Sequence, residues 1–247
     1  MLNTNQEQKP IFPAIQYKQT RKVIVSPSMM AERRLVMGVR NNPCVPVFKH
    51  LRTHVLQQIR ENGWNSIAIV SPDSGCGKSF LAANLGIALS MEVNQTVLLV
   101  DVDFYRPKLG WHFGVENEKG IVNYLYDDYP VEKLLINPGF DRLVILPAGK
   151  GSEDVSSELL TLPKMTELIN DIKSRYQSRI ILFDLPPLLA SDDAMLFMPN
   201  YDSALLVVED GKTSPDAVSR SLSLLHETNV LGTVLNKTTA NKNNYLY

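Results

Sequence analysis

Six stretches of the chain carry apolar residues at nearly every position, without the alternation that marks a half-exposed strand. Such runs of Val, Ile and Leu are typical of strands buried on both faces of a sheet. Between them lie segments with apolar residues at helical spacing. The strand-like runs are SIAIVS (66–71), TVLLVD (96–101), RLVILP (142–147), RIILFD (179–184), SALLVVED (203–210) and VLGTVLNK (230–237). This order predicts an α/β fold, a mainly parallel sheet with helices on both faces.

The N-terminal part of the chain has a different character. Its first residues are polar, punctuated by proline and aperiodic, as expected of an extended arm. The first predicted helix is VFKHLRTHVLQQIREN (47–62), which Gly63 closes. Its apolar positions are Val47, Leu51, Val55, Leu56 and Ile59. We therefore expect a basic, largely extended arm over residues 1–45, one α/β domain over 46–240 and a flexible tail over 241–247.

The net charge of −1 hides an asymmetry along the chain. Residues 1–66 hold ten Lys/Arg and three Asp/Glu, a net of +7, whereas the remainder holds fifteen and twenty-three, a net of −8. A basic arm can face anionic lipid, an acidic partner or nucleic acid, or it can be a solvated tail. No basic patch with interleaved aromatic residues is present, so we expect no nucleic-acid partner.

Three features predict a cytoplasmic protein. The two cysteines, Cys44 and Cys76, cannot form a disulfide framework. The N-terminal residues lack the basic and apolar regions of a signal peptide, and no apolar run approaches the roughly 18 residues that span a bilayer. Any membrane association is therefore expected to be peripheral or through a partner.

The segment SPDSGCGKSF (71–80) joins one buried run to the helical pattern FLAANLGIALSM. Strand, loop and helix in this order are the setting of a phosphate-binding loop, although a plain strand-to-helix turn is the alternative. Lys78 is expected to neutralise the β- and γ-phosphates and Ser79 to ligate Mg²⁺. The residues expected around the phosphates are Ser74, Gly75, Cys76, Gly77, Lys78, Ser79 and Phe80.

Two details qualify this loop. Pro72 stands where the usual pattern opens with glycine, and it supplies no amide, but a curl built by Gly75 and Gly77 tolerates it. A second Gly-Lys-Thr triplet lies in DGKT (210–213). Because no glycine-rich turn precedes this second triplet, we do not expect it to contact phosphate.

Acidic residues end two of the buried runs. TVLLVDVDF carries Asp101 and Asp103, and RIILFDLPP carries Asp184. Paired carboxylates at a strand end can hold Mg²⁺ through a water and deprotonate an attacking hydroxyl, and Asp184 resembles the acid that completes the metal shell. We therefore assign catalysis to Lys78 and the three aspartates, and the metal to Ser79 with the same aspartates. The alternatives are a capping role for Asp103 and a solvated strand-end carboxylate for Asp184.

Four motifs together resemble those of the bacterial tyrosine autokinases (BY-kinases) of the CpsD/CapB type, which serve capsule and exopolysaccharide systems. They are Lys78 in its loop, LLVDVDFYRP (98–107) as Walker A′, ILFDLPPLLASDDA (181–194) as Walker B, and GTVLNK (232–237) before a tyrosine-bearing end. The resemblance implies a P-loop NTPase fold with deviant Walker motifs, like that of ParA and MinD.

The resemblance also implies an activity. Such kinases bind Mg-ATP and transfer its γ-phosphoryl group to a C-terminal tyrosine cluster of neighbouring copies. Tyr245 and Tyr247 are the corresponding acceptors, and Arg106 and Asn236 the further nucleotide-binding residues. The implied partners are the cytosolic tail of an inner-membrane polysaccharide co-polymerase, other copies of the chain and a tyrosine phosphatase. The protein would then lie in the cytoplasm, peripheral to the inner membrane through that partner, and regulate polysaccharide polymerisation and export.

Several residues depart from the kinase pattern. Cys76 replaces an acid in the loop, and Pro46 replaces the glutamate of a segment that helps to assemble a ring of copies. Two alternatives therefore stay open: a ParA/MinD-like ATPase, and a nucleotide-sensing regulatory subunit without tyrosine kinase activity. Against the first, Asp73 stands where such ATPases carry an extra lysine. His50 and His54 have an i, i+4 spacing but no third ligand, and we interpret them as solvated helix residues rather than a zinc site.

Overall fold

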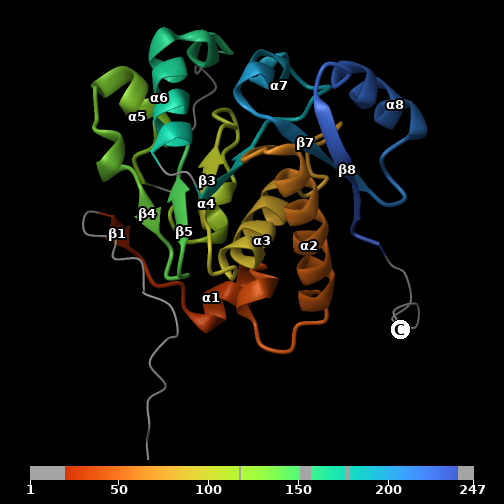
Figure 1. The fold of residues 1–247 in the computed structure, drawn as a ribbon, viewed down its shortest axis with the longest axis horizontal. Coiled ribbons are helices and arrows are strands. Elements are labelled where there is room, and N and C mark those ends of the chain that lie inside the picture. The colour runs from red at the N-terminus through yellow and green to blue at the C-terminus, as the bar shows by residue number, and fades with distance from the viewer. Residues whose placement is uncertain (1–19, 117, 151–156, 176–177, 239–247) are drawn as a thin grey trace, which may run out of the picture.

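An eight-stranded sheet forms the centre of the molecule (Figure 1), in the order β1-β4-β5-β3-β6-β2-β7-β8. We describe residues 20–116, 118–150, 157–175 and 178–238 of a computed structural model. Every neighbouring pair of these strands is parallel except β4 and β5. The strands are β1 (Arg21–Lys22), β2 (Ser66–Val70), β3 (Thr96–Asp101), β4 (Ile136–Asn137), β5 (Leu143–Leu146), β6 (Arg179–Asp184), β7 (Ser203–Glu209) and β8 (Asn229–Asn236).

Helices cover both faces of this sheet, which confirms the predicted fold class. Alternate residues of β2 belong to two separate apolar clusters, one on each face of the sheet. Ile67 and Ile69 belong to the cluster under α1 to α4, and Ala68 and Val70 belong to the cluster under α5 to α8. The α-helices are α1 (Pro27–Glu32), α2 (Val45–Asn62), α3 (Lys78–Ser90), α4 (Leu109–His112), α5 (Ile121–Asp127), α6 (Pro163–Ser174), α7 (Asp193–Leu196) and α8 (Pro215–Leu224). Short 3₁₀ turns are η1 (Val36–Gly38), η2 (Val131–Lys133), η3 (Ser157–Thr161) and η4 (Met198–Asn200).

Helix α2 ends where the sequence predicts. Asn62 is its last residue, and Gly63 follows at φ 69°, the left-handed conformation of a helix C-cap. The apolar face is rotated from the predicted one. Phe48 is buried, whereas Val47 is 44% exposed, and the ring of Phe48 packs against that of Phe80 in α3.

The segment before α2 differs from the extended arm expected over residues 1–45. Within residues 20–44, the chain forms β1 beside β4, then α1 and η1. Val25, Leu35 and Met37 are buried in the same cluster as α2 and α3. These apolar side chains have no regular spacing, so a pattern search does not find the elements that they hold in place. Residues 1–19 and the tail from 239 lie outside the described residues.

Asn84 of α3 holds this segment by its polar groups. Its Oδ1 accepts the N–H of Met37 at 3.1 Å, and its Nδ2 donates to the carbonyl of Arg34 at 3.0 Å. Asn84 is fully buried. A buried amide that satisfies two backbone groups fixes the path of the segment, and it ties that path to the helix that follows the phosphate-binding loop.

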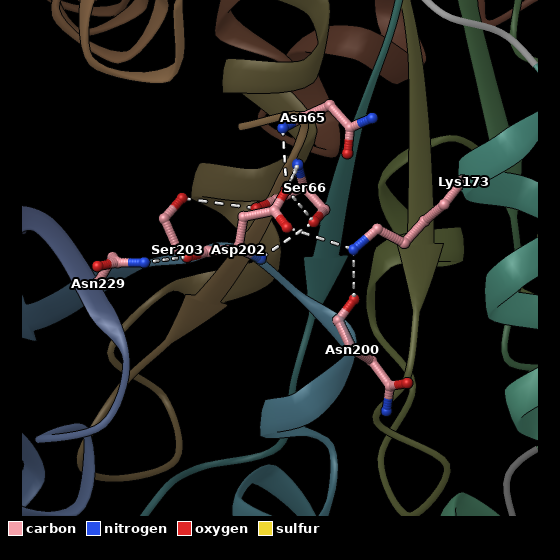
Figure 2. A network of polar contacts seen from close by, with 7 residues as sticks. All are labelled: Asn65, Ser66, Lys173, Asn200, Asp202, Ser203 and Asn229. Atoms are coloured by element: carbon pink, nitrogen blue, oxygen red, sulfur yellow. Dashed lines mark hydrogen bonds and ion pairs between the residues drawn. The ribbon is translucent and has the colours of Figure 1, made fainter. Parts of the chain in front are cut away.

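A polar network ties the strands together at the edge of the sheet where β2 and β7 begin (Figure 2). The carboxylate of Asp202 accepts the N–H groups of Asn65 and Ser66, each at 2.9 Å, and the Ser66 hydroxyl at 2.7 Å. The ammonium group of Lys173 in α6 lies 3.4 Å from the Asp202 carboxylate, and the Asn229 side chain donates to the backbone carbonyl of Asp202. Burial opposes the ionisation of Asp202, but these donors still hold its pKa below the usual range.

Candidate functional site

The loop between β2 and α3 lies at the opposite edge of the sheet, where the parallel strands end. Gly75 and Gly77 take φ values of 86° and 100°, which side chains rarely adopt. At Gly77 there is also no room for one, because a Cβ atom would lie 2.1 Å from the side-chain nitrogen of Asn236. Helix α3 begins directly afterwards, at Lys78, so its first N–H groups lie at the end of the loop.

Lys78 folds back along this loop. Its ammonium group donates to the Ser71 hydroxyl at 3.2 Å, and that hydroxyl donates to the carbonyl of Asp73 at 2.7 Å. The side chain is only 7% exposed. A buried ammonium group held by one neutral hydroxyl keeps two further donors, which suits the binding of phosphate oxygens.

Two backbone contacts fix the start of the loop to the segment after β6. The N–H of Leu188 donates to the carbonyl of Ser71 at 2.9 Å, and the N–H of Leu189 donates to the carbonyl of Pro72 at 3.1 Å. Pro72 therefore takes part in the loop through its oxygen, and the N–H that it lacks is not needed for these contacts. On the other side, the Asn236 side chain donates to the carbonyl of Cys76 at 2.8 Å.

Asp101 and Asp184 end the neighbouring strands β3 and β6 and are directly opposite each other in register. Each is about 1% exposed. Neither carboxylate oxygen of Asp184 has a hydrogen-bond partner of ordinary geometry among the described residues. Burial raises the pKa of Asp184 to about 7, although the charge of Lys78 and the nearby Ser79 hydroxyl lower it. Asp184 is thus a buried acid whose ionised form a nearby cation would favour.

Burial also raises the pKa of Asp101 well above its ordinary value, and the charges of Asp184 and Asp103 raise it further. The N–H groups of Asp103 and Leu109 donate to the Asp101 carboxylate at 3.2 and 3.1 Å. Asp103 is only half-buried, and its carboxylate accepts the N–H of Arg106 at 2.8 Å. Strand β3 ends at Asp101, so Asp103 lies outside it, in the turn that its bond to Arg106 closes. The charge of Asp103 still raises the pKa of both Asp101 and Asp184.

A magnesium ion fits this arrangement in one specific way. Among the described residues, no three His, Cys, Asp or Glu side chains are placed to hold a metal ion by themselves. Mg²⁺ commonly keeps several waters and takes few ligands from protein, with phosphates supplying others. The Ser79 hydroxyl and the unpartnered oxygens of Asp184 suit such a cation bound together with a nucleotide.

Other predicted site residues have different neighbours. The ring centroid of Phe80 lies 5.8 Å from that of Phe48 and 6.5 Å from that of His112. The side chain therefore packs against these rings, and only the backbone of Phe80, at the start of α3, is left for the nucleotide site. The guanidinium group of Arg106 lies over the Tyr105 ring at 5.4 Å, and its nucleotide-binding role stays a prediction. The predicted acceptors, residues 245 and 247, lie outside the described residues.

One neighbour of the loop is not indicated by the sequence pattern. Thr213, in the second Gly-Lys-Thr triplet, has its hydroxyl oxygen 3.8 Å from the sulfur of Cys76. The same oxygen accepts the N–H of Glu209 at 2.9 Å, which fixes the turn after β7. A prediction that β7 pairs with β2, as it does, would have indicated this contact. Loops that follow neighbouring parallel strands lie at the same edge of the sheet.

The mostly parallel sheet, the glycine loop with its lysine and the strand-end acids define a P-loop nucleotide-binding domain. The family model of the CobQ/CobB/MinD/ParA nucleotide binding domain matches residues 67–246, and the chain belongs to this family. Three similar proteins and one similar solved structure are described below.

The tyrosine-protein kinase YwqD of Bacillus subtilis is 28% identical over 191 residues, which cover 76% of this chain and 79% of that protein. The succinoglycan biosynthesis transport protein ExoP of Rhizobium meliloti is 31% identical over 85% of this chain, but the chain spans only 27% of ExoP. The chain likewise spans 28% of EpsB of Ralstonia nicotianae, with 28% identity over 86% of this chain.

The kinase domain of the Escherichia coli tyrosine kinase Etk superposes with a TM-score of 0.74 at 24% identity, covering 95% of both chains. At this identity the similarity shows the fold alone. Among the helices that the structure describes, none combines the length and the apolar character needed to cross a membrane.

Proposed function

We propose that this protein is an ATP-dependent protein tyrosine kinase that binds Mg-ATP at the loop around Lys78. It transfers the γ-phosphoryl group to tyrosines of neighbouring copies, with Tyr245 and Tyr247 as acceptors. The names of relatives such as YwqD, a tyrosine-protein kinase, support the reaction class. The observation that carries the proposal is the buried Asp184 carboxylate. Its two oxygens have no hydrogen-bond partner of ordinary geometry among the described residues, and burial raises its pKa while the charge of Lys78 lowers it.

On this proposal the three aspartates have different roles, which follow from their different surroundings. Asp101 and Asp184 are buried with raised pKa values, which a nearby cation reverses because opposite charge favours the ionised form. They are therefore the metal-side acids, together with Ser79. Bound Mg²⁺ supplies neutralisation of phosphate charge. Asp103 is the more accessible acid, and on this proposal it receives the proton of the attacking tyrosine.

In the reaction, the phenolic oxygen of the acceptor forms a bond to the γ-phosphorus while the bond from that phosphorus to the β,γ-bridging oxygen breaks. ADP leaves, and Asp103 takes the phenolic proton. Lys78 and the N–H groups at the start of α3 hold the phosphate oxygens. Asn236 holds the loop in shape through the carbonyl of Cys76.

The name of ExoP, a succinoglycan biosynthesis transport protein, supports a role in exopolysaccharide or capsule production. We extend the proposal to the cytosolic tail of an inner-membrane polysaccharide co-polymerase as the activating partner. A tyrosine phosphatase would reverse the modification. On this proposal the protein works in the cytoplasm, next to the inner membrane.

A second candidate is an ATPase or nucleotide-sensing regulator that transfers no phosphate to tyrosine. Membership of a family that includes MinD and ParA favours it, and so do the departures at Pro72, Cys76 and Pro46. Both candidates require the same nucleotide site. They differ only in the fate of the γ-phosphoryl group.

The test is intact-mass measurement and phosphotyrosine mapping after incubation with Mg-ATP. Wild type, Lys78→Ala, the double variant Tyr245→Phe/Tyr247→Phe and a control, Tyr126→Phe, are compared. Tyr126 is 62% exposed and lies in α5, outside the proposed acceptors. We expect phosphate on wild type and on the control, and none on the other two.

Mixing the Lys78→Ala and double variants tests transfer between copies, because only the first carries the acceptors and only the second carries the active loop. Phosphate on the Lys78→Ala chains is the expected result. ATP hydrolysis that depends on Lys78, without any phosphotyrosine even when a co-polymerase tail is added, would establish the second candidate instead.

A further inference from the structure

Two histidines on α2 lie side by side on its exposed face. The Nε2 atoms of His50 and His54 are 3.0 Å apart, and the ring centroids are 4.5 Å apart at an interplanar angle of 72°. Both residues are exposed. The spacing of four residues places them one helical turn apart, but only the structure shows that the same nitrogen of each ring faces the other.

The opposite face of α2 buries Phe48, Val55 and Ile59, so the histidines do not contribute to the core. Their partners among the described residues are each other. In the metal-free chain, one imidazole N–H donates to the nitrogen of the other. When a metal ion binds, the proton between the rings moves to the Nδ1 atom of its own imidazole, so that both Nε2 atoms become neutral nitrogen ligands on the same face of α2.

We infer that His50 and His54 form a binding site for a divalent late first-row transition metal, with Cu²⁺ the preferred ion and water in the remaining positions. Two nitrogens 3.0 Å apart with metal bonds of about 2.0–2.1 Å subtend an angle of about 91–97° at the metal. This angle belongs to the cis positions of a tetragonal site, which suits Cu²⁺ and Ni²⁺. A tetrahedral Zn²⁺ site at the same bond lengths needs nitrogens about 3.3–3.4 Å apart.

Two histidines at this spacing on one helical face form half of a known zinc-binding arrangement, so the helix geometry is able to present both rings to one ion. Cu²⁺ also binds nitrogen ligands more tightly than Ni²⁺ or Zn²⁺ in the general order of stabilities. The site lies on the exposed face of α2, and it does not depend on the proposed kinase activity.

The test is titration of the full chain, free of any polyhistidine tag, with Cu²⁺ at about pH 7.5, above the ordinary histidine pKa. Binding is measured by calorimetry, and the ligands are identified by the nitrogen hyperfine pattern of the Cu²⁺ electron paramagnetic resonance spectrum. We expect one equivalent to bind with two imidazole nitrogens. Loss of an outer partner of a metal ligand costs about 10- to 100-fold in affinity, so His50→Gln or His54→Gln should each weaken binding at least tenfold.

Matched variants make the result specific. His226→Gln removes another exposed histidine and should leave Cu²⁺ affinity unchanged, and Cys44→Ser should do the same for the exposed thiol. Circular dichroism checks that the glutamine variants keep their helices. Equal Cu²⁺ affinity in wild type and both glutamine variants would overturn the site, and so would loss of binding in Cys44→Ser. Tighter binding of Zn²⁺ than of Cu²⁺ would overturn the tetragonal assignment.

Discussion

The side chain of Asn236 donates to the backbone carbonyl of Cys76 at 2.8 Å, across 160 residues of sequence. This bond joins the end of β8 to the middle of the phosphate-binding loop, and Gly77 lies too close to Asn236 to carry a side chain. The shape of the loop therefore depends on a strand that is formed from a distant part of the chain.

Asn236→Ala should weaken ATP binding. A lost hydrogen bond of this kind costs about 1–2 kcal/mol, or roughly 5- to 30-fold in affinity. The control is Asn229→Ala on the same strand, whose side chain donates to Asp202 at the far edge of the sheet. Calorimetric titration with Mg-ATP should show weaker binding only for Asn236→Ala, and equal losses in both variants would contradict a local effect.

Asp184 should make the stability of the chain depend on pH when metal and nucleotide are removed by a chelator and dialysis. Its folded-state pKa of about 7 lies above the ordinary value of 3.8, so the folded state holds the proton more tightly than the unfolded state. Its contribution to stability is complete below about pH 4 and is lost as the pH rises toward and through 7. The full loss is on the order of 4 kcal/mol.

Asp184→Asn removes this titration. Urea unfolding at several pH values should therefore show a flatter stability profile for the variant between pH 4 and 7, and greater stability than wild type at pH 8. The variant should also bind Mg-ATP less tightly, because it removes the acid on the metal side. Parallel profiles for the two chains would show that Asp184 does not titrate in this range.

Asp202→Ala should destabilise the fold without changing nucleotide binding. The variant leaves the buried N–H and hydroxyl groups of Ser66 without their acceptor, at a cost of about 1–3 kcal/mol for each unsatisfied group. Asp171→Ala is the matched control. It breaks an exposed ion pair with Arg175, which is worth about 1 kcal/mol or less. Urea unfolding measures both, and unchanged Mg-ATP affinity in both checks that the two edges of the sheet are independent.

Asn84→Ala should release the segment before α2. The N–H of Met37 and the carbonyl of Arg34 lose their buried partner, so native-state hydrogen exchange at the Met37 amide should become faster. Ser90→Ala on the same helix is the control, because its hydroxyl donates to the carbonyl of Ile87 within that helix. If exchange at Met37 is the same in both variants, Asn84 does not hold the segment.

The sequence predicts well those features that neighbouring residues determine. A buried run, two glycines, Lys78 and a helical pattern are contiguous, and the structure shows the strand, loop and helix in that order. Strand-end acids are equally local, although the turn that Asp103 makes with Arg106 is not visible as a pattern.

Features formed by distant residues could not be predicted in this way. The bonds from Asn65 and Ser66 to Asp202 span 137 and 136 residues, and nothing in the local sequence of Asn65 indicates them. Val25, Leu35 and Met37 are buried by packing against α2 and α3 rather than by a periodic pattern of their own. For His50 and His54, spacing indicates proximity, but the rotamers decide which nitrogens meet.

The contact between Gly77 and Asn236 also sets an order of events during synthesis. The loop leaves the ribosome long before β8, and until Asn236 has emerged the Cys76 carbonyl lacks its donor. A nascent chain that stops short of this residue already contains Lys78 and all three strand-end aspartates, yet it lacks the bond that fixes the loop to β8. On the proposed function, nucleotide binding would therefore reach its full affinity only after translation has passed residue 236.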